Sequence, residues 1–364
     1  MAEIVITEFI DDDVARELAE AHDVLYDPDL VDRRDDLIAA ASECSALIVR
    51  NRTRIDAALL DRCANLRVIG RVGVGLERID LEACAARGVV VCPAKGANAI
   101  AVAEYVIAGL LILFRGGAFH ATVQVTGGAW PRTQLIGREL CGRRLGLVGF
   151  GDIARAVAPR AAALGMRVAG CDPYVDEDDP AWRTLAAARV DLDALLEESD
   201  AVSLHVPLTG ETRRLIDAAA LAKMKADAVL VNTTRGGVVD EAALIDALKA
   251  GRIAGAMLDV FEEEPLTAES GARFENVPNL ILIPHIAGVT RESNRRLSMV
   301  TVTFCGSCAV GAEAGPTRRA IAPVHWRQWR PGPESNRRSG ICSPVHYHFA
   351  TRPETPPHTS GYYH

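Results

Sequence analysis

The amino-acid sequence predicts an α/β protein built from two doubly wound lobes with a central cleft between them. Two observations support this fold class: short β-rich runs alternate with helical patterns through residues 1–304, and a long apolar helical stretch at 99–114 separates them into two sets. Strands that alternate with helices form parallel sheets covered on both faces, because each crossover helix packs on one face. Each set therefore predicts one lobe of Rossmann-like or flavodoxin-like topology.

The pattern of residues 1–98 predicts one small α/β lobe. Its candidate strands lie at 4–8, 46–50, 67–70 and 89–92, and its candidate helices at 12–22, 35–42, 56–63 and 81–87. A helical pattern at 290–302 follows the last strand of the chain and would return to this lobe. We therefore assign residues 1–98 together with about 289–304 to one domain.

Residues 99–288 predict the second lobe. The long helix opens it, and a polar, glycine-containing arm at 115–140 follows. Candidate strands then recur at 145–149, 167–171, 201–206, 228–232, 255–259 and 280–283. Six such strands predict a six-stranded parallel sheet with helices on both faces.

The turn after the first of these strands has the sequence of a dinucleotide-binding loop. It reads Gly149-Phe150-Gly151-Asp152-Ile153-Ala154, and Asp172 ends the next strand. Gly149 permits a sharp turn, Gly151 lets the backbone approach a pyrophosphate, and the small Ala154 allows close packing of helix on strand. Asp172 would accept hydrogen bonds from the adenosine ribose hydroxyls and repel a 2′-phosphate. The pattern therefore predicts NAD rather than NADP.

Composition favours a soluble, cytoplasmic enzyme. The 364 residues are 49% hydrophobic with a net charge of −8, which argues against nucleic acid as a partner. We find no apolar run of about 20 residues that could span a membrane, and no export signal at the N-terminus. Nine scattered cysteines are typical of reduced thiols, and the lone CxxC at residues 305–308 has no second pair, so we predict no metal site.

Residues 305–364 have an atypical composition. They contain seven Arg and three Glu, a net charge of +4, and eight of the 18 prolines, but no leucine. A packed segment is not built in this way. Two interpretations remain open: a tail derived from a frameshift or read-through near residues 302–305, or a genuine disordered basic tail.

Three segments place titratable side chains just past apolar strands, where doubly wound sheets bind ligands. These are residues 231–237, 258–265 and 283–288, which contain Arg235, Glu264 and His285. An arginine can hold a substrate carboxylate with two parallel hydrogen bonds. A histidine can donate a proton to a carbonyl oxygen, and a neighbouring carboxylate raises its pKa and fixes its tautomer. The three groups together predict carbonyl reduction.

With these motifs, residues 1–302 resemble the D-isomer-specific 2-hydroxyacid dehydrogenases, in the branch around D-3-phosphoglycerate dehydrogenase. The resemblance rests on the runs at 235–240 and 259–265 and on Pro284-His285. It implies that Arg235 binds substrate, that His285 is the acid/base and that Glu264 is its partner. It also implies a two-fold dimer through residues 115–140, with Trp130 as an apolar anchor.

The resemblance implies the other site residues as well. The cofactor set is Gly149, Gly151, Asp152, Ile153, Ala154, Asp172, Pro207, Thr233, Asp259, His285 and Gly288, and the substrate set is Arg50, Arg52, Val74, Gly75 and Arg235. Backbone N–H groups of a glycine turn form an anion nest, which independently suits Val74 and Gly75 to a carboxylate.

The substrate implied is a 2-hydroxy acid with a second anionic group, with 3-phosphoglycerate and sulfolactate both candidates. Residues 76–80 read Leu-Glu-Arg-Ile-Asp, which departs from the usual family pattern and leaves the substrate open. The alternatives to an enzyme are an NAD-sensing binding protein, like the co-repressors that share this fold, and an inactive product of a frameshifted gene.

Overall fold

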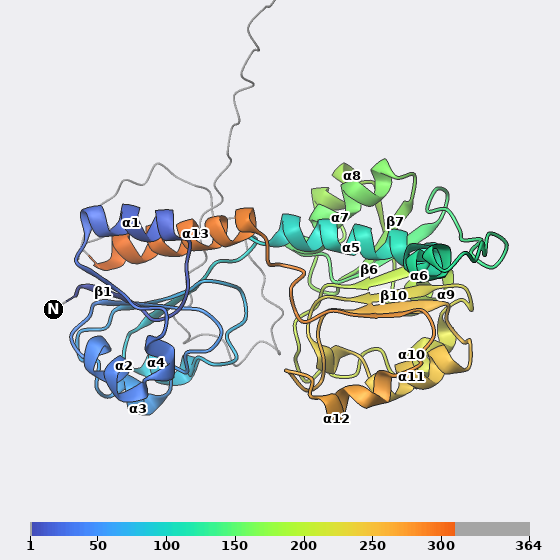
Figure 1. Ribbon diagram of the computed structural model, residues 1–364. Helices are drawn as coiled ribbons and strands as arrows, with labels where there is room; N and C mark the ends of the chain where they lie inside the picture. The colour runs from blue at the N-terminus through green and yellow to red at the C-terminus, as the bar shows by residue number, and fades with distance from the viewer. Residues whose placement is uncertain (1, 310–364) are drawn as a thin grey trace, which may run out of the picture.

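The computed structural model describes residues 2–309 and confirms the α/β fold with two parallel sheets (Figure 1). The smaller sheet has the strand order β2-β1-β3-β4-β5. Its strands are β1 (Ile4–Ile6), β2 (Val24–Tyr26), β3 (Ala46–Val49), β4 (Val68–Arg71) and β5 (Val90–Pro93). Strand β2 was not predicted, because its apolar Val-Leu-Tyr sequence has only three residues, is partly exposed and follows directly on the predicted helix at 12–22.

Helices cover both faces of the smaller sheet. On one face lie α1 (Asp12–Ala21) and α13 (Arg291–Ala309), and on the other lie α2 (Arg34–Ala41), α3 (Ala57–Leu60) and α4 (Leu81–Ala86), with the short 3₁₀ turn η1 (Leu30–Asp32) before α2 (Figure 1). Strands β1, β3 and β4 are almost completely buried, because both faces are covered. Their apolar runs therefore made them predictable from sequence.

The larger sheet has seven strands rather than the six predicted, in the order β12-β11-β10-β9-β6-β7-β8. They are β6 (Arg144–Val148), β7 (Arg167–Cys171), β8 (Ala187–Arg189), β9 (Ala201–Leu204), β10 (Val229–Asn232), β11 (Gly255–Leu258) and β12 (Leu280–Leu282). The additional strand is β8, at the sheet edge. Its short Ala-Ala-Arg sequence is largely exposed and gives no β-strand signal.

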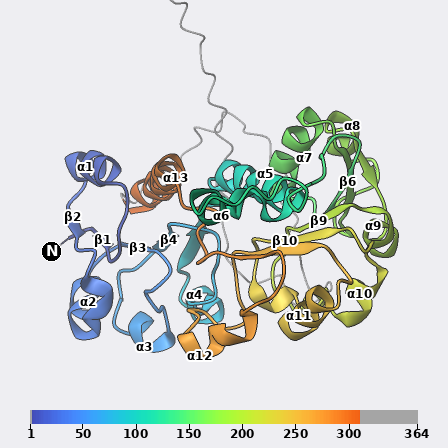
Figure 2. The same ribbon diagram turned by 45° about the vertical axis from the view of Figure 1, so that its right-hand side comes forward.

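Two groups of helices cover the larger sheet. One face carries α5 (Ala99–Phe114), α7 (Asp152–Ala163) and α8 (Pro180–Thr184), and the other carries α9 (Leu192–Glu198), α10 (Ala218–Lys223) and α11 (Glu241–Lys249) (Figure 2). The short segments η3 (Gly236–Val238), α12 (Ala268–Gly271) and η4 (Ala272–Phe274) lie between the strands. Aspartates cap helices in both lobes, and each accepts a backbone N–H of the first turn. These N-cap residues are Asp11, Asp56, Asp80, Asp179, Asp191, Asp217 and Asp240.

Two segments connect the lobes. Helix α5 leaves the smaller lobe, and α13 returns to it and packs on β3 and β4. Helix α13 continues beyond the predicted end at residue 302, and Cys305 is buried against the backbone of Gly70. Residues 305–309 thus belong to this helix. The frameshift and disordered-tail interpretations of the remaining residues lie outside the described part of the chain.

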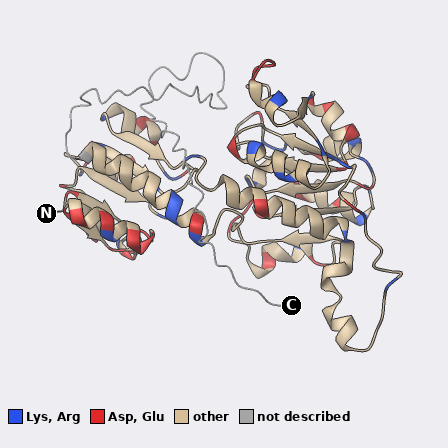
Figure 3. Ribbon diagram, turned by 90° about the horizontal axis from the view of Figure 1, so that it is seen from above, with Lys and Arg blue, Asp and Glu red and all other residues tan. Residues whose placement is uncertain are grey.

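The arm at residues 115–140 extends away from the larger lobe (Figure 3). It contains η2 (Gly116–His120) and α6 (Thr122–Thr126), and neither has a buried residue. Its large apolar side chains are exposed, including Val123 at 81% and Trp130 at 74%. Among residues 2–309, no helix is both long and apolar enough to cross a membrane.

Candidate active site

The candidate site is built from the carboxyl ends of strands in both sheets. In the larger sheet, β6 pairs with both β7 and β9, so the crossover helices on its two sides leave in opposite directions at this point. A crevice at such a switch point is where doubly wound sheets bind ligands. In the smaller sheet, β1 lies at the corresponding point between β2 and β3.

The glycine loop after β6 has the backbone that a pyrophosphate requires. Gly149 has φ of +88°, and a Cβ there would lie 2.7 Å from the carbonyl oxygen of His205. Gly151 is the N-cap of α7, and a Cβ at this position would meet nothing within 4 Å. Ala154, in the first turn of α7, is completely buried. The open N-terminus of α7, which begins at Asp152 and Ile153, therefore fits a dinucleotide phosphate.

Asp172 ties this loop to the second strand. Its Oδ2 accepts the N–H of Phe150 at 2.8 Å, and its Oδ1 accepts the N–H of Tyr174 at 2.9 Å. The carboxylate therefore holds the glycine loop in place at the position that the ribose is expected to occupy. This structural role accompanies the predicted one, since each carboxylate oxygen can accept a further hydrogen bond.

Two polar side chains without a hydrogen-bond partner among the described residues follow the neighbouring strands β9 and β10. The Thr233 Oγ1 atom, at the end of β10, is buried and has no hydrogen-bond partner among the described residues. His205, two residues before Pro207, is also buried without a ring partner in that part of the chain, and burial lowers its pKa to about 3. Pro207 accepts the Thr212 hydroxyl at 2.6 Å. An unsatisfied buried hydroxyl such as that of Thr233 fits a polar ligand that the protein binds here.

His285 and Glu264 form a close pair. Nδ1 of His285 lies 2.8 Å from Oε2 of Glu264, and the histidine side chain is 50% exposed. The hydrogen bond that Glu264 accepts from the imidazole raises the pKa of His285 above its ordinary value. Burial raises the pKa of Glu264, but the hydrogen bonds from His285 and from the N–H of Phe261, with the charges of His285 and Arg235, together lower that pKa. The pair therefore favours the protonated imidazole, and Nε2 is left to exchange its proton.

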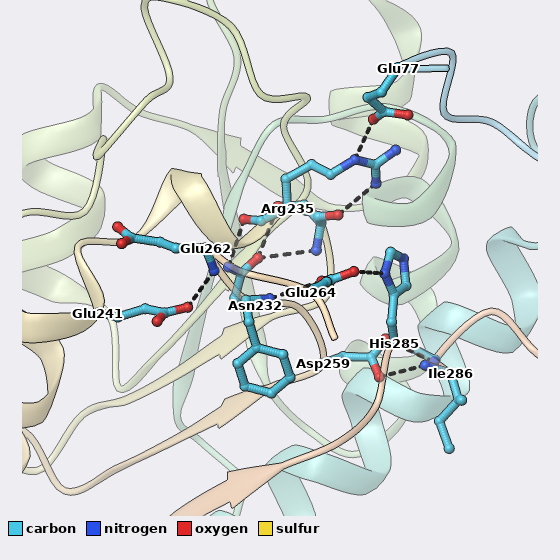
Figure 4. A network of polar contacts seen from close by, with 12 residues as sticks. Glu77, Asn232, Arg235, Glu241, Asp259, Glu262, Glu264, His285 and Ile286 are labelled. Atoms are coloured by element: carbon cyan, nitrogen blue, oxygen red, sulfur yellow. Dashed lines mark hydrogen bonds and ion pairs between the residues drawn. The ribbon is translucent and has the colours of Figure 1, made fainter. Parts of the chain in front are cut away.

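Asp259 fixes the segment that carries His285. Its two carboxylate oxygens accept the N–H groups of Ile286 at 2.7 Å and Ala287 at 2.9 Å (Figure 4). His285 itself has a left-handed φ of +55°, and Gly288 packs against Asn98. Because the carboxylate is 1% exposed, burial raises its pKa. The structure thus gives Asp259 a positioning role that the sequence did not predict.

Arg235 reaches the same region from the end of β10. Its Nε donates to Oε1 of Glu77 at 2.6 Å, and its Nη1 donates to the Thr234 carbonyl at 2.7 Å. Figure 4 shows Arg235 and His285 pointing into one space, with Glu77 approaching from the other lobe. The positive charge of Arg235 opposes protonation of His285, because the two groups lie close to each other. The structure therefore brings Arg235, Glu264 and His285 together.

The smaller lobe contributes the loop at residues 50–53, which carries Arg50 and Arg52. One buried carboxylate holds the backbone of this loop. Glu8, at the end of β1, accepts the backbone N–H groups of residues 50–53 at 2.8 to 3.2 Å. Burial would raise the pKa of Glu8, but these donors lower it. Arg50 then donates to the Asn294 side chain at 2.8 Å. Arg52 is not brought to the cluster, because its guanidinium pairs with Asp32 at the surface.

Arg71 is a cation that sequence reasoning missed. It lies at the end of β4 and donates to the carbonyls of Val72 and Gly75, at 2.6 and 2.9 Å, so it shapes the loop that carries Val74 and Gly75. Burial and the nearby charges of Arg50 and Arg235 lower its pKa to about 10, against the opposing effect of Glu8 and Glu77. Its position directly before the glycine turn was the signal that could have indicated it.

Glu241 was also missed. Its buried carboxylate accepts the N–H of Glu262 at 2.6 Å and pairs with Arg273. It thereby anchors the turn that carries Glu264, whose Oε1 accepts the N–H of Phe261 at 2.9 Å (Figure 4).

Among the described residues, no group of three potential ligands could hold a metal ion, and the pair Cys305 and Cys308 lies within α13.

The His285–Glu264 pair predicts a measurable pH dependence. We expect reduction of an oxo acid at this site to need protonated His285, so that its rate falls as pH rises through the pKa of His285. Glu264→Gln removes the interaction that raises this pKa, so the falling limb should move to lower pH. The position of the falling limb is measured from the pH profile of kcat/KM for oxo-acid reduction. A profile identical to that of the unaltered protein would remove Glu264 from the proton transfer.

This chain is similar to known dehydrogenases along most of its length. Residues 107–287 match the family model described as D-isomer specific 2-hydroxyacid dehydrogenase, NAD binding domain. The chain is 52% identical over 302 residues to an (S)-sulfolactate dehydrogenase of Chromohalobacter salexigens, which covers 83% of this chain and 96% of the relative.

More distant relatives extend this similarity. A D-3-phosphoglycerate dehydrogenase of Archaeoglobus fulgidus is 38% identical over 288 residues, which cover 79% of this chain but 53% of the relative. The solved structure of a D-lactate dehydrogenase from Aquifex aeolicus, complexed with NAD and lactic acid, superposes with a TM-score of 0.71 at 27% identity, over 85% of this chain and 96% of that one.

Proposed function

This chain belongs to the D-isomer specific 2-hydroxyacid dehydrogenase family, and from that premise we propose which residues act in it and on what substrate. The protein is an NAD-dependent oxidoreductase that interconverts a small anionic 2-hydroxy acid and its 2-oxo acid. We assign the substrate-binding domain to residues 1–98 and about 289–304, and the NAD-binding domain to 99–288. The observation that carries the assignment is the His285–Glu264 pair, 2.8 Å apart, in the space that Arg235 enters.

The proton chemistry belongs to His285. In reduction of the oxo acid, its Nε2–H donates to the carbonyl oxygen, and Glu264 stabilises the imidazolium before transfer and orients the ring. In the reverse direction, neutral His285 accepts the hydroxyl proton. Arg235 holds the substrate carboxylate, together with the N–H groups of Val74 and Gly75. The carbon to be reduced is thereby fixed beside the histidine.

The NAD cofactor, when bound, accepts or supplies the hydride at C2 of the substrate. The glycine loop and the N-terminus of α7 would hold its phosphates, and Asp172 its adenosine ribose. Pro207, Thr233, Asp259 and Gly288 would hold its nicotinamide end. The negative charge of Asp172 favours NAD over NADP, because it would repel a 2′-phosphate.

We propose a substrate with a second acidic group at C3, of the sulfolactate class. Arg71 interacts electrostatically with both Arg50 and Arg235, so three cations lie near one another, with Glu8 and Glu77 as the carboxylates beside them. A dianionic substrate balances this charge better than a monoanionic one. The similarity to a sulfolactate dehydrogenase over 302 residues supports a sulfonate in preference to a phosphate.

A comparison of two oxo acids tests this substrate class. We expect kcat/KM for 3-sulfopyruvate to exceed that for pyruvate, and Arg50→Gln to lower the former by about 10- to 100-fold while changing the latter little, because a hydrogen bond to a charged group contributes about 1.5–3 kcal/mol. Arg52→Gln is the matched control, since Arg52 pairs with Asp32. Equal losses for both substrates in Arg50→Gln would contradict a sulfonate at this position.

We also propose a homodimer formed through the arm. Exposed apolar side chains gather there, among them Phe119, Val123, Trp130 and Ile136, and such a set is typical of an interface. Light scattering at micromolar concentration should give twice the chain mass, and Trp130→Ala should shift the mass toward the monomer. A monomeric unaltered protein would exclude the dimer.

The cytoplasm is the compartment that we propose. Of the residues in the described part of the chain, eight are cysteines and all are free thiols. Reduced thiols and dependence on NAD both suit a reducing compartment.

A further inference from the structure

Glu77 lies where a bound substrate carboxylate is expected. It comes from the glycine loop of the smaller lobe and contacts Arg235 of the larger lobe, 158 residues away in sequence. The contact joins Oε1 of Glu77 to Nε of Arg235 at 2.6 Å. The chain thus brings one of its own carboxylates to the arginine that binds carboxylates in the proposed function.

The surroundings of Gly75 place both charged groups against the loop. A Cβ on Gly75 would lie 2.3 Å from Oε2 of Glu77 and 2.4 Å from Nη2 of Arg235. The glutamate carboxylate and the guanidinium therefore share the space directly over the backbone whose N–H groups are proposed to bind substrate. A substrate carboxylate cannot enter that space without displacing Glu77.

The charge of Glu77 suits it to this position. Burial would raise the pKa of Glu77, but the charge and hydrogen bond of Arg235 lower it, so the side chain is ionised at neutral pH. Arg235 also gives Nη1 to the Thr234 carbonyl. With Nε engaged by Glu77, Arg235 cannot present the fork of parallel donors formed by Nε and Nη2 to a second carboxylate.

We propose that Glu77 is an internal competitor for the substrate carboxylate, which occupies Arg235 in the ligand-free enzyme and withdraws when substrate binds. This inference rests on the proposed function, because it requires Arg235 to bind substrate. Glu77 then sets the affinity for every carboxylate that uses Arg235, since each must replace the same ion pair. The glutamate side chain is 64% exposed, so it can swing into solvent without unfolding the loop.

Two variants separate direct occupancy from long-range charge. Glu77→Gln keeps the shape and removes the charge, whereas Glu77→Asp keeps the charge but shortens the side chain by one methylene, which takes its carboxylate out of hydrogen-bond reach of Arg235. The probe is oxamate, a monocarboxylate analogue of a 2-oxo acid, titrated into the protein saturated with NADH. Its dissociation constant is read from NADH fluorescence, alongside the KM and kcat for 3-sulfopyruvate.

We expect both variants to bind oxamate about fivefold tighter, because an exposed ion pair contributes up to about 1 kcal/mol. The KM should fall by a similar factor while kcat stays within about twofold. Glu198→Gln is the control, since it removes an exposed glutamate paired with Arg144 on the larger lobe and should change neither constant.

Unchanged or weaker oxamate binding in Glu77→Gln would overturn the proposal. Tighter binding in Glu77→Gln but not in Glu77→Asp would overturn it too, because the effect would then come from charge at a distance. The variant Arg235→Lys distinguishes a failure of this proposal about Glu77 from a failure of the proposed function. If Arg235→Lys binds oxamate as well as the unaltered protein, Arg235 does not hold the carboxylate and both proposals fail.

Discussion

Replacing His285 with alanine should lower kcat by about 10²- to 10⁴-fold, the range that a positioned general acid contributes. The dissociation constant of NADH should stay within about twofold, because the glycine loop and Asp172 are untouched. The imidazole is the group that Glu264 holds at 2.8 Å, and its pKa is raised by that contact. Steady-state turnover and NADH fluorescence measure the two quantities.

His22→Ala is the matched control for this experiment. His22 also pairs with a glutamate through Nδ1, at 3.1 Å from Glu3, but in the smaller lobe under α1. Its loss should leave kcat nearly unchanged. If His285→Ala retained more than a tenth of the original kcat, a different group would have to supply the proton.

Substitution of Arg235 by lysine should lower kcat/KM by about 100-fold, mainly through a higher KM. A lysine keeps the charge but cannot present two parallel donors to a carboxylate. In the structure, Arg235 uses Nε toward Glu77 and Nη1 toward the Thr234 carbonyl, so the planar group is held in one orientation. Lysine would lose that orientation as well. The measurement is KM and kcat for 3-sulfopyruvate at saturating NADH.

Arg144→Lys gives the corresponding control, because Arg144 forms an exposed pair with Glu198 on the same lobe. It should leave KM within about twofold. An Arg235→Lys variant with unchanged KM would show that the substrate carboxylate is held elsewhere.

Most of the strands that the sequence predicted are buried on both faces, although the three-residue edge strand β12 was predicted as well. Strands such as β3 and β10 are continuous apolar runs, since helices cover them on each side. The strands that it missed, β2 and β8, lie at sheet edges and have three residues each. The Ala-Ala-Arg sequence of β8 has no β-strand pattern, and the three apolar residues of β2 are too few to be distinguished from the end of the preceding helix.

The residues predicted from motifs also lie together in the structure, whereas the contacts that position them could not be predicted. Arg235, Glu264 and His285 each follow an apolar strand, and parallel strands end at one edge of a sheet. The contact of Glu77 with Arg235 depends instead on how two lobes meet. The two backbone N–H bonds of Asp259 depend on the path of the chain after His285. Neither has a local sequence signal.

The central claim is that this site catalyses NAD-dependent reduction of an anionic 2-oxo acid. Oxidation of NADH by the unaltered protein in the presence of 3-sulfopyruvate tests it most directly. We predict saturable turnover with one NADH oxidised for each sulfopyruvate consumed. Tight binding of NADH with no turnover of 3-sulfopyruvate, 3-phosphohydroxypyruvate or pyruvate would contradict the account and identify a protein that binds the cofactor without using it.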